Sequence, residues 1–218
     1  MAPTIPNRFL FKFEFPLHRC KAAPRIDGRV EDWDENWRLP ALHGLDGEKG
    51  FADLYATWNE EGLFLGVAVR GKKKPPRCEP QQFWKSDNVR LMTDMRDTRN
   101  IRRATRFCQH FYFLPCGGGR DGRAAVAGAD KVQRATANAP LPAAGVIPVA
   151  SNVSRGGYSL TAHVPGAVLH GFDPGEHPRI GIMVMVEDSE LGRQSLTVGD
   201  DLNWFIDPST WPTAVLGE

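Results

Sequence analysis

Short stretches in which apolar and polar residues alternate, separated by turn residues, constrain this chain more than any other feature of its sequence. The first stretch spans residues 8–15 (RFLFKFEF), in which four phenylalanines share one face and Lys12 and Glu14 the other. Because a period of two puts successive side chains on opposite faces of a β-strand, such stretches predict strands. Helical periodicity is almost absent. Similar alternation recurs over residues 51–58, 87–94, 107–114 and 158–164.

Two nearly continuous apolar runs predict buried strands. Residues 63–69 (LFLGVAV) follow the polar turn 59–62, so they are expected to form a hairpin with residues 51–58. Residues 180–186 (IGIMVMV) fit a central strand, and residues 213–216 fit a closing one.

The segments between these strands are rich in glycine, proline or charge and are expected to be loops. Residues 95–106 carry many arginines, and residues 124–148 are weakly periodic, which leaves a linker open there as an alternative. Short helical turns are expected near Trp37 and over residues 166–170. The pattern as a whole predicts an all-β chain: a single antiparallel β-sandwich, jelly-roll or immunoglobulin-like, with long loops and one or two short helical turns.

Length and charge narrow the class of protein. The chain has 218 residues, of which 41% are hydrophobic, and sandwiches of about 200–250 residues form one domain. One domain over residues 1–218 is therefore predicted. Lys and Arg number 27 against 26 Asp and Glu, and the net charge of +1 predicts no nucleic-acid partner. No run approaches the ~18 apolar residues of a membrane span, so no membrane partner is expected.

The N-terminal residues and the cysteines suggest a compartment. The N-terminus has no signal-peptide pattern, which predicts a cytoplasmic location for the chain as written, or a secreted one where an export signal has been removed. None of the four cysteines belongs to a CxxC pair, and in that setting reduced thiols are expected.

No catalytic motif stands out. The glycine-rich stretch 117–122 lacks the Lys-Ser/Thr of a P-loop, and no GxSxG or HExxH phrase is present. Carboxylates in residues 187–190 or 200–201 leave a glycosidase pair open as an alternative. The sequence thus favours a binding protein over an enzyme.

Six short phrases follow one another in order along nearly the whole chain. They are IDG at 26–28 with Trp37, ATWN at 56–59 with LFL at 63–65, FWKSDNVRL at 83–91, YSLTAHVP at 158–165, IGI at 180–182 with ED at 187–188, and Trp204 with DPS at 207–209 and Trp211. Together they resemble the phrases of the family 9 carbohydrate-binding modules and the wider DOMON-like sandwich group. The resemblance implies a family-9-like β-sandwich and non-catalytic binding of an oligosaccharide or polysaccharide.

In that family a sugar is sandwiched between two tryptophans, and the resemblance places these at Trp84 and Trp204. The chemistry is sensible, because the C–H face of a pyranose packs on an indole while its hydroxyls need polar partners. Both residues lie in polar, loop-like settings. The resemblance therefore implies an aromatic clamp, and the alternative is that both are ordinary, partly buried core tryptophans.

The polar partners of the sugar are where the sequence departs from the family. Arg90 stands where the family has a glutamate, and Met185 stands where it has a polar amide. The family's central-strand arginine aligns with Gln109, His110 or Phe111, and the alignment leaves all three open. The family's sugar specificity is therefore not expected to transfer.

Two further expectations concern charge. Arg90 and the arginines of residues 96–106 suggest an anionic sugar, because guanidinium pairs with carboxylate or sulfate; the alternative is a solvated loop paired with its own aspartates. The family also binds structural calcium, and Asp188 and Asp207 are the candidate ligands here. No other cofactor is required.

Two other functions remain open from the sequence. One is a DOMON-type domain that holds haem or another cofactor. The other is a structural or interaction domain that has kept the sandwich and lost its sugar site. The axial candidates for haem are Met92, Met183, Met185 and His110.

Overall fold

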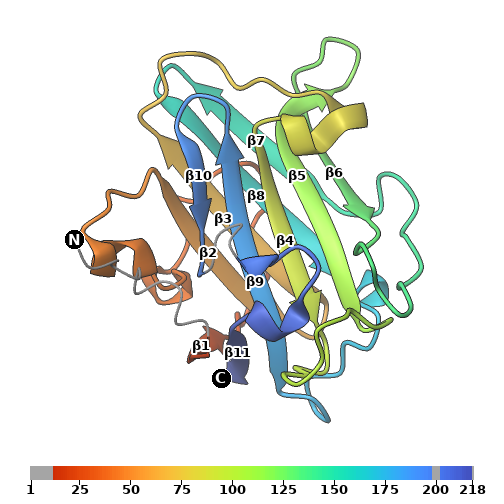
Figure 1. The fold of residues 1–218 in the computed structure, drawn as a ribbon. Helices are drawn as coiled ribbons and strands as arrows, with labels where there is room; N and C mark the ends of the chain where they lie inside the picture. Colours follow the sequence, from red (N-terminus) through yellow and green to blue (C-terminus); the bar gives the residue numbers. More distant parts are fainter. Residues whose placement is uncertain (1–11, 198–201, 218) are drawn as a thin grey trace, which may run out of the picture.

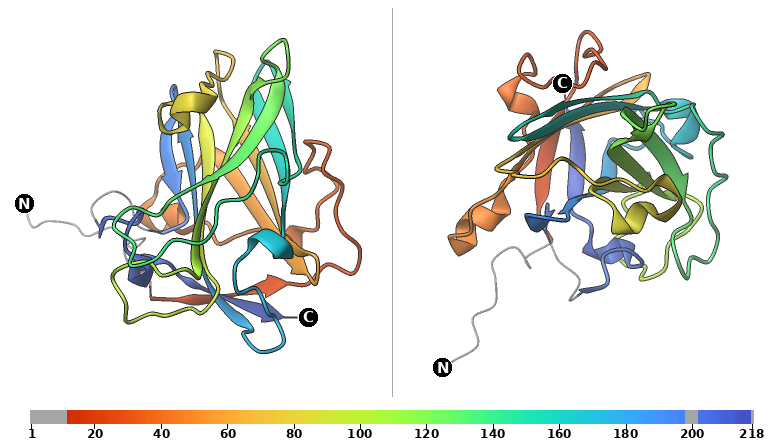
Figure 2. Two further views of the ribbon diagram at one scale, coloured as in Figure 1. Left: turned by 90° about the vertical axis from the view of Figure 1, so that its right-hand side faces the viewer. Right: turned by 90° about the horizontal axis from the view of Figure 1, so that it is seen from above.

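The computed structural model describes residues 12–197 and 202–217, with the backbone alone at position 46. Within these residues the chain forms two packed sheets, a front sheet of seven strands and a back sheet of four. Figure 1 looks onto the front sheet, and the left view of Figure 2 shows the two sheets side by side. The predicted all-β sandwich is confirmed.

The front sheet runs in the order β1-β11-β9-β4-β5-β6, and β10 pairs with β9 off this path. Of its pairings, β1 with β11 is parallel and the others are antiparallel. Its strands are β1 (Glu14–His18), β4 (Asn88–Asp94), β5 (Cys108–Gly118), β6 (Ala124–Asp130), β9 (Arg179–Asp188), β10 (Gly192–Ser195) and β11 (Thr213–Gly217).

The back sheet is antiparallel throughout and runs in the order β2-β3-β8-β7. Its strands are β2 (Ala52–Asn59), β3 (Gly62–Arg70), β7 (Val149–Ser154) and β8 (Gly157–Pro165). Short 3-10 turns lie in the connections: η2 (Glu35–Trp37), η3 (Leu42–Asp46), η4 (Pro80–Lys85), η5 (Gly166–Val168) and η7 (Pro208–Thr210).

The core lies between the sheets because alternate residues of the central strands are apolar. In the front sheet, Leu91 of β4 pairs with Phe111 of β5 and with Val184 of β9, and all three side chains are fully buried. The residues between them in sequence point to the outer side of the sheet, where Arg90 pairs with Tyr112 and Met185. The period-two pattern therefore sets which side chains reach the outer face.

Most of the expected strands are present, with three differences. The strand expected over residues 8–15 begins only at Glu14 and continues to His18, because these are the residues that pair with β11; residues 8–11 lie outside the described residues. Part of the weakly periodic region 124–148 is the strand β6. The strands β7 and β10 were not expected. No helix within the described residues is long and apolar enough to cross a membrane.

A buried lysine ties the connection between β3 and β4 to the end of β9. Lys72 Nζ lies 3.0 Å from Asp87 Oδ2 and 2.6 Å from Asp188 Oδ2, and the three side chains are shielded from solvent. Backbone N–H groups of Arg77 and Ser189 also donate to the Asp87 carboxylate. Every charge in this cluster is thus paired, which is the condition for tolerating it in a core.

The pKa values reflect this pairing. Burial alone would raise the pKa of Asp87, but the hydrogen bonds from Ser189, Lys72 and Arg77 outweigh it, so the pKa lies below its ordinary value. Burial alone would lower the pKa of Lys72, but its bonds to Asp188 and Asp87 raise it. Lys72 and Asp87 therefore both stay ionised at neutral pH.

Replacing this lysine by an apolar residue should destabilise the fold. In Lys72→Met, the carboxylates of Asp87 and Asp188 lose their counter-charge inside the core, so the free energy of unfolding should fall by about 3–5 kcal/mol at neutral pH. Denaturant unfolding measures the loss. The control is Lys73→Met, since Lys73 is exposed and its change should stay within about 0.5 kcal/mol.

Lowering the pH should reduce the difference in unfolding free energy between Lys72→Met and the wild type. The depressed pKa of Asp87 contributes stability above the carboxylate's ordinary pKa, and that contribution is lost as the pH falls through the folded value. In the variant, protonation of Asp87 instead removes a buried negative charge that has lost its counter-charge. A gap below about 1 kcal/mol at neutral pH would contradict a stabilising role for the cluster.

Candidate functional site

The turn η4 presents Trp84 to solvent at the edge of the front sheet. Pro80 begins the turn, where a missing N–H costs nothing, and Phe83 is buried. The Phe83 ring stacks on Tyr112 of β5, with centroids 4.0 Å apart and planes 6° from parallel. Since Phe83 anchors the turn inward, its neighbour Trp84 lies outward with 49% of its surface exposed, edge-on to Phe83.

Arg90 lies beside this turn and contacts two aromatic rings. Its guanidinium carbon is 5.7 Å from the centre of the Phe83 ring and 5.8 Å from that of Trp204, distances typical of cation–π contacts. It donates to the Trp84 carbonyl at 3.3 Å and to Asn88 Oδ1 at 3.0 Å. The ring face of Trp204 that the clamp would offer a sugar is thus next to a side chain of the protein itself.

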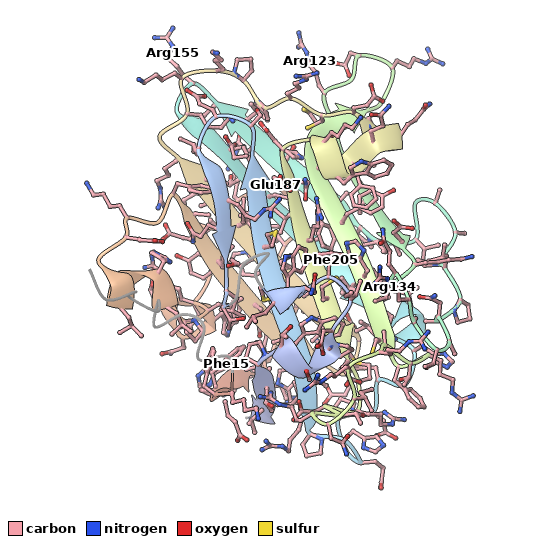
Figure 3. All side chains as sticks on the ribbon, in the orientation of Figure 1. Phe15, Arg123, Arg134, Arg155, Glu187 and Phe205 are labelled. Carbon is pink, nitrogen blue, oxygen red and sulfur yellow. The ribbon has the colours of Figure 1, made fainter. Side chains whose placement is uncertain are left out.

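Glu187 of β9 completes a charged group on the outer face. One of its oxygens accepts from Arg90 at 3.0 Å and the other from Arg193 of β10 at 2.9 Å. All three side chains keep some contact with solvent. Figure 3 labels Glu187 and Phe205, and both lie over the front of the sheet. This group and Trp84 are here named the outer-face site: Trp84, Arg90, Glu187 and Arg193.

The two tryptophans expected to form a clamp differ in exposure. Trp204 is only 1% exposed, packs edge-on against Phe205, and its carbonyl accepts from Trp211 Nε1 at 2.7 Å. It lies just before η7, where Asp207 caps the turn by accepting from Ser209. Trp84 and Trp204 meet through Arg90, which contacts the carbonyl of one and the ring of the other.

Met185 and His110 lie beneath the outer-face site. Met185 is fully buried and pairs with Arg90, and His110 is buried next to the Phe83 ring. Within the described residues, His110 Nε2 is buried and has no hydrogen-bond partner. Burial, and to a lesser degree the charge of Arg90, lowers the pKa of His110 to about 3. The imidazole is therefore neutral.

Gln109 does not join this group. It is the register partner of Thr93, whose hydroxyl donates to its amide oxygen at 2.9 Å, and its nitrogen faces the carbonyls of Arg106 and His170. Because side chains alternate along β5, Gln109 points to the opposite side of the sheet from His110. Of the positions left open by the alignment, His110 is the one on the outer side.

The arginines of residues 96–106 lie in the loop between β4 and β5 and are mostly used within the protein. Arg96 stacks on Phe107 and donates to the Gly171 carbonyl at 2.6 Å. Arg99 donates to the Trp211 carbonyl at 2.9 Å and pairs loosely with Asp97. These contacts fasten the loop to its neighbours, which agrees with a structural use of this group.

The two calcium candidates have other partners in the structure. Asp188 accepts from Lys72 and from the backbone N–H groups of Glu190 and Leu191, and Asp207 caps η7. Among the residues that the structure describes, no three His, Cys, Asp or Glu side chains are grouped as a metal site would require. The calcium role of Asp188 and Asp207 remains a prediction from the resemblance.

The haem candidates share one face of the front sheet, where the described residues pack closely around them. Met92 pairs with His110 on one side and with Met183 on the other, and all are buried. The pocket that His110 lines, between β5 and residues 138–142, holds only about 10 Å³. Small-molecule sites are typically about 300 Å³ or larger. The arrangement does not fit haem.

Sequence reasoning did not assign Phe83, Tyr112 or Arg193 to the site, and it gave Glu187 a role only as part of a glycosidase pair left open. Phe83 and Tyr112 form its aromatic base, and Glu187 and Arg193 supply its second and third charges. The alternation of residues 107–114 does put Tyr112 on the same face as His110, so that residue was within reach. Arg193 lies on β10, which has too few residues for a periodic signal.

A pH-dependent stability should follow from the buried His110. In the unfolded chain His110 takes up a proton below the ordinary pKa of 6.5, whereas in the folded chain it does so only near pH 3. The free energy of unfolding therefore decreases as the pH is lowered from 6.5 towards 3. At about pH 5.5 the loss is about 1.4 kcal/mol. His110→Leu has no such loss. Between about pH 7.5 and pH 5.5, the free energy of unfolding of the wild type should therefore decrease by about that amount relative to the variant, as measured by denaturant unfolding. Parallel pH curves would contradict the burial argument.

The comparisons with known proteins concern the fold. No protein-family model and no curated protein sequence matches the chain. A family 9 carbohydrate-binding module from Caldicellulosiruptor kristjanssonii in complex with cellotriose is 14% identical, with a TM-score of 0.63 over 93% of each chain. A family 9 module from the same organism in complex with glucose is 15% identical, with a TM-score of 0.60 over 94% of this chain and 95% of that one.

A third solved structure has the same architecture. It is a Bacteroides uniformis ATCC 8492 protein, provisionally described as carbohydrate-binding, which is 13% identical with a TM-score of 0.54 over 94% of this chain and 99% of that one. At such low identities the likeness is one of fold. The chain has the β-sandwich fold seen in family 9 carbohydrate-binding modules.

Proposed function

We propose that this chain is a non-catalytic carbohydrate-binding module whose ligand packs on Trp84 at the outer-face site. The observation that carries the proposal is an exposed tryptophan whose carbonyl accepts from Arg90, a member of a group of charged hydrogen-bonding side chains. A sugar needs both, because its C–H face packs on an aromatic ring while its hydroxyls must keep hydrogen bonds. Two modules of the same fold are solved with cellotriose and with glucose, which supports a sugar as the ligand.

The proposal gives the two tryptophans different tasks. Trp84 contacts the sugar directly. Trp204 packs against the Arg90 guanidinium and holds it at the edge of the site, so the second wall of the expected clamp acts through Arg90. The Arg90 side chain is 12% exposed, enough for a guanidinium edge to reach a ligand at the surface.

An anionic sugar is the finer form of the proposal. Two guanidinium groups of the outer-face site, Arg90 and Arg193, donate to Glu187, and the exposed Lys85 follows Trp84 in sequence. Guanidinium groups pair bidentately with carboxylate or sulfate, which supports a uronic-acid or sulfated sugar.

Non-catalytic action is part of the proposal. A glycosidase needs two carboxylates that can act as acid and as base or nucleophile. Glu187 is held by two arginines and Asp188 by Lys72, which favours a structural use of both carboxylates. The carboxylates at 200–201 lie outside the described residues.

Replacing the exposed indole should abolish most binding. Trp84→Ala should weaken affinity for the bound oligosaccharide by about tenfold or more, since truncating a central aromatic contact typically costs about 2 kcal/mol. Tryptophan fluorescence and calorimetric titration with cello-oligosaccharides, oligogalacturonate and a sulfated oligosaccharide give the affinity. Trp37→Ala is the matched control, because Trp37 packs on Trp33 behind the back sheet. If no sugar in the panel binds the wild type, the domain is an interaction domain that has kept only the fold.

The charge preference has its own test. Arg90→Ala should lower affinity for acidic oligosaccharides about tenfold and affinity for neutral ones much less, because a charge-assisted hydrogen bond contributes roughly 1.5–3 kcal/mol. The preference should also weaken as salt is raised, since ions screen exposed charges. Equal losses for neutral and acidic ligands, at any salt, would rule out an anionic ligand while leaving sugar binding intact.

A further inference from the structure

Two of the four cysteines lie in direct contact. The sulfur atoms of Cys78 and Cys116 are 2.7 Å apart, although 38 positions separate them in sequence. Cys78 lies in the connection between β3 and β4, just before η4, and Cys116 lies near the end of β5. Figure 1 shows this connection passing over the end of β5.

The backbone holds these two segments against each other. Cys116 Sγ lies 3.6 Å from the Pro76 carbonyl, and Cys78 Sγ lies 3.8 Å from that of Asp87. A Cβ placed on Gly117 would come within 3.4 Å of the Cys78 Cβ and within 2.8 Å of the Pro80 ring, so the two chains approach as closely as a glycine allows. The thiols therefore meet through a fixed backbone.

The other two cysteines offer a built-in contrast. Cys20 and Cys108 are fully buried, and burial raises the pKa of each thiol, to about 12 for Cys108. Cys78 and Cys116 are partly exposed. Because a reagent must reach the sulfur before it can react, exposure singles out the contacting pair.

We propose that Cys78 and Cys116 are a thiol–disulfide exchange site that closes into an intramolecular disulfide on reaction with a low-molecular-weight disulfide such as oxidised glutathione. The proposal is independent of sugar binding.

Cys116 is the attacking thiol, because it lines an open pocket of about 530 Å³ with Pro75, Pro76 and Arg123, which gives a small disulfide a way in. The contact with Cys78, and then the positive charge of Lys72, lower the pKa of Cys116 against the opposing effect of burial. The Arg123 guanidinium is exposed and suits the carboxylates of glutathione.

The exchange balances in two steps. The Cys116 thiolate attacks one sulfur of oxidised glutathione, breaks its S–S bond, and releases one glutathione thiolate, which leaves a mixed disulfide on Cys116. Cys78 then loses its proton to solvent and attacks the Cys116 sulfur, which releases the second glutathione thiolate. The hydrogen bond to Cys116, and then burial, raise the pKa of Cys78, and the first step removes the Cys116 charge that contributes to this rise. Two protein thiols are oxidised and one glutathione disulfide is reduced.

The bond would fasten the segment that carries η4 to β5. Closing a loop of this length restricts the unfolded chain, so the oxidised protein should melt about 5–10 °C above the reduced protein.

The test uses the full chain, first reduced and then equilibrated with oxidised glutathione, trapped with an alkylating reagent and digested for mass spectrometry. The expected result is one linked peptide pair containing Cys78 and Cys116, with Cys20 and Cys108 alkylated, and the expected rise in melting temperature. Cys78→Ser should instead retain glutathione on Cys116, and Cys20→Ser should form the bond as the wild type does.

Two outcomes would overturn the proposal. One is alkylation of all four cysteines after equilibration with oxidised glutathione. The other is a stable mixed disulfide on Cys116 of the wild-type chain without loss of the Cys78 thiol. Both are read from the wild-type protein, so they hold even where a variant fails to fold, and neither depends on whether a sugar binds.

Discussion

A single buried ammonium group holds together the end of the sandwich where the candidate site lies. Lys72 leaves the back sheet just after β3, and its charge is shared by Asp87, just before β4, and Asp188, at the end of β9. An unpaired carboxylate in this setting would carry a large desolvation cost, so the three residues need one another. The connection that bears η4, and with it Trp84 and Cys78, starts and ends at this cluster.

The outer face then follows from how the aromatic residues are arranged. Phe83 packs down on Tyr112, which leaves its neighbour Trp84 in solvent, and Arg90 lies close to the rings of Phe83 and Trp204. The protein has thus placed one of its own cations next to aromatic surface that a ligand would otherwise contact. This differs from a simple pair of exposed tryptophans, and it explains how an arginine is accommodated where the resembling family has a glutamate.

The central strands could be predicted from the sequence, because a strand with one face in the core and the other outward alternates strongly between apolar and other residues. The strands β7 and β10 escaped for opposite reasons: β7 is polar and partly exposed on both faces, and β10 has four residues. The exposure of Trp84 agreed with its polar surroundings in sequence. The polar surroundings of Trp204 in sequence did not indicate its burial, because its ring packs against the distant Arg90 of β4, a tertiary contact without a local signal. The pairing of Cys78 with Cys116 is equally non-local.

The parallel pairing of β1 with β11 has a mechanical consequence. Glu14 is matched with Thr213 and His18 with Gly217, so the strand nearest one end of the chain and the strand nearest the other lie side by side and run in the same direction. A pulling force applied at residue 14 and at residue 217 would slide the two strands along each other. The evenly spaced hydrogen bonds of a parallel pair would then be loaded together, in shear, and not opened one after another as in a hairpin that is peeled apart. Tension along the chain would therefore meet its first resistance at this edge of the front sheet.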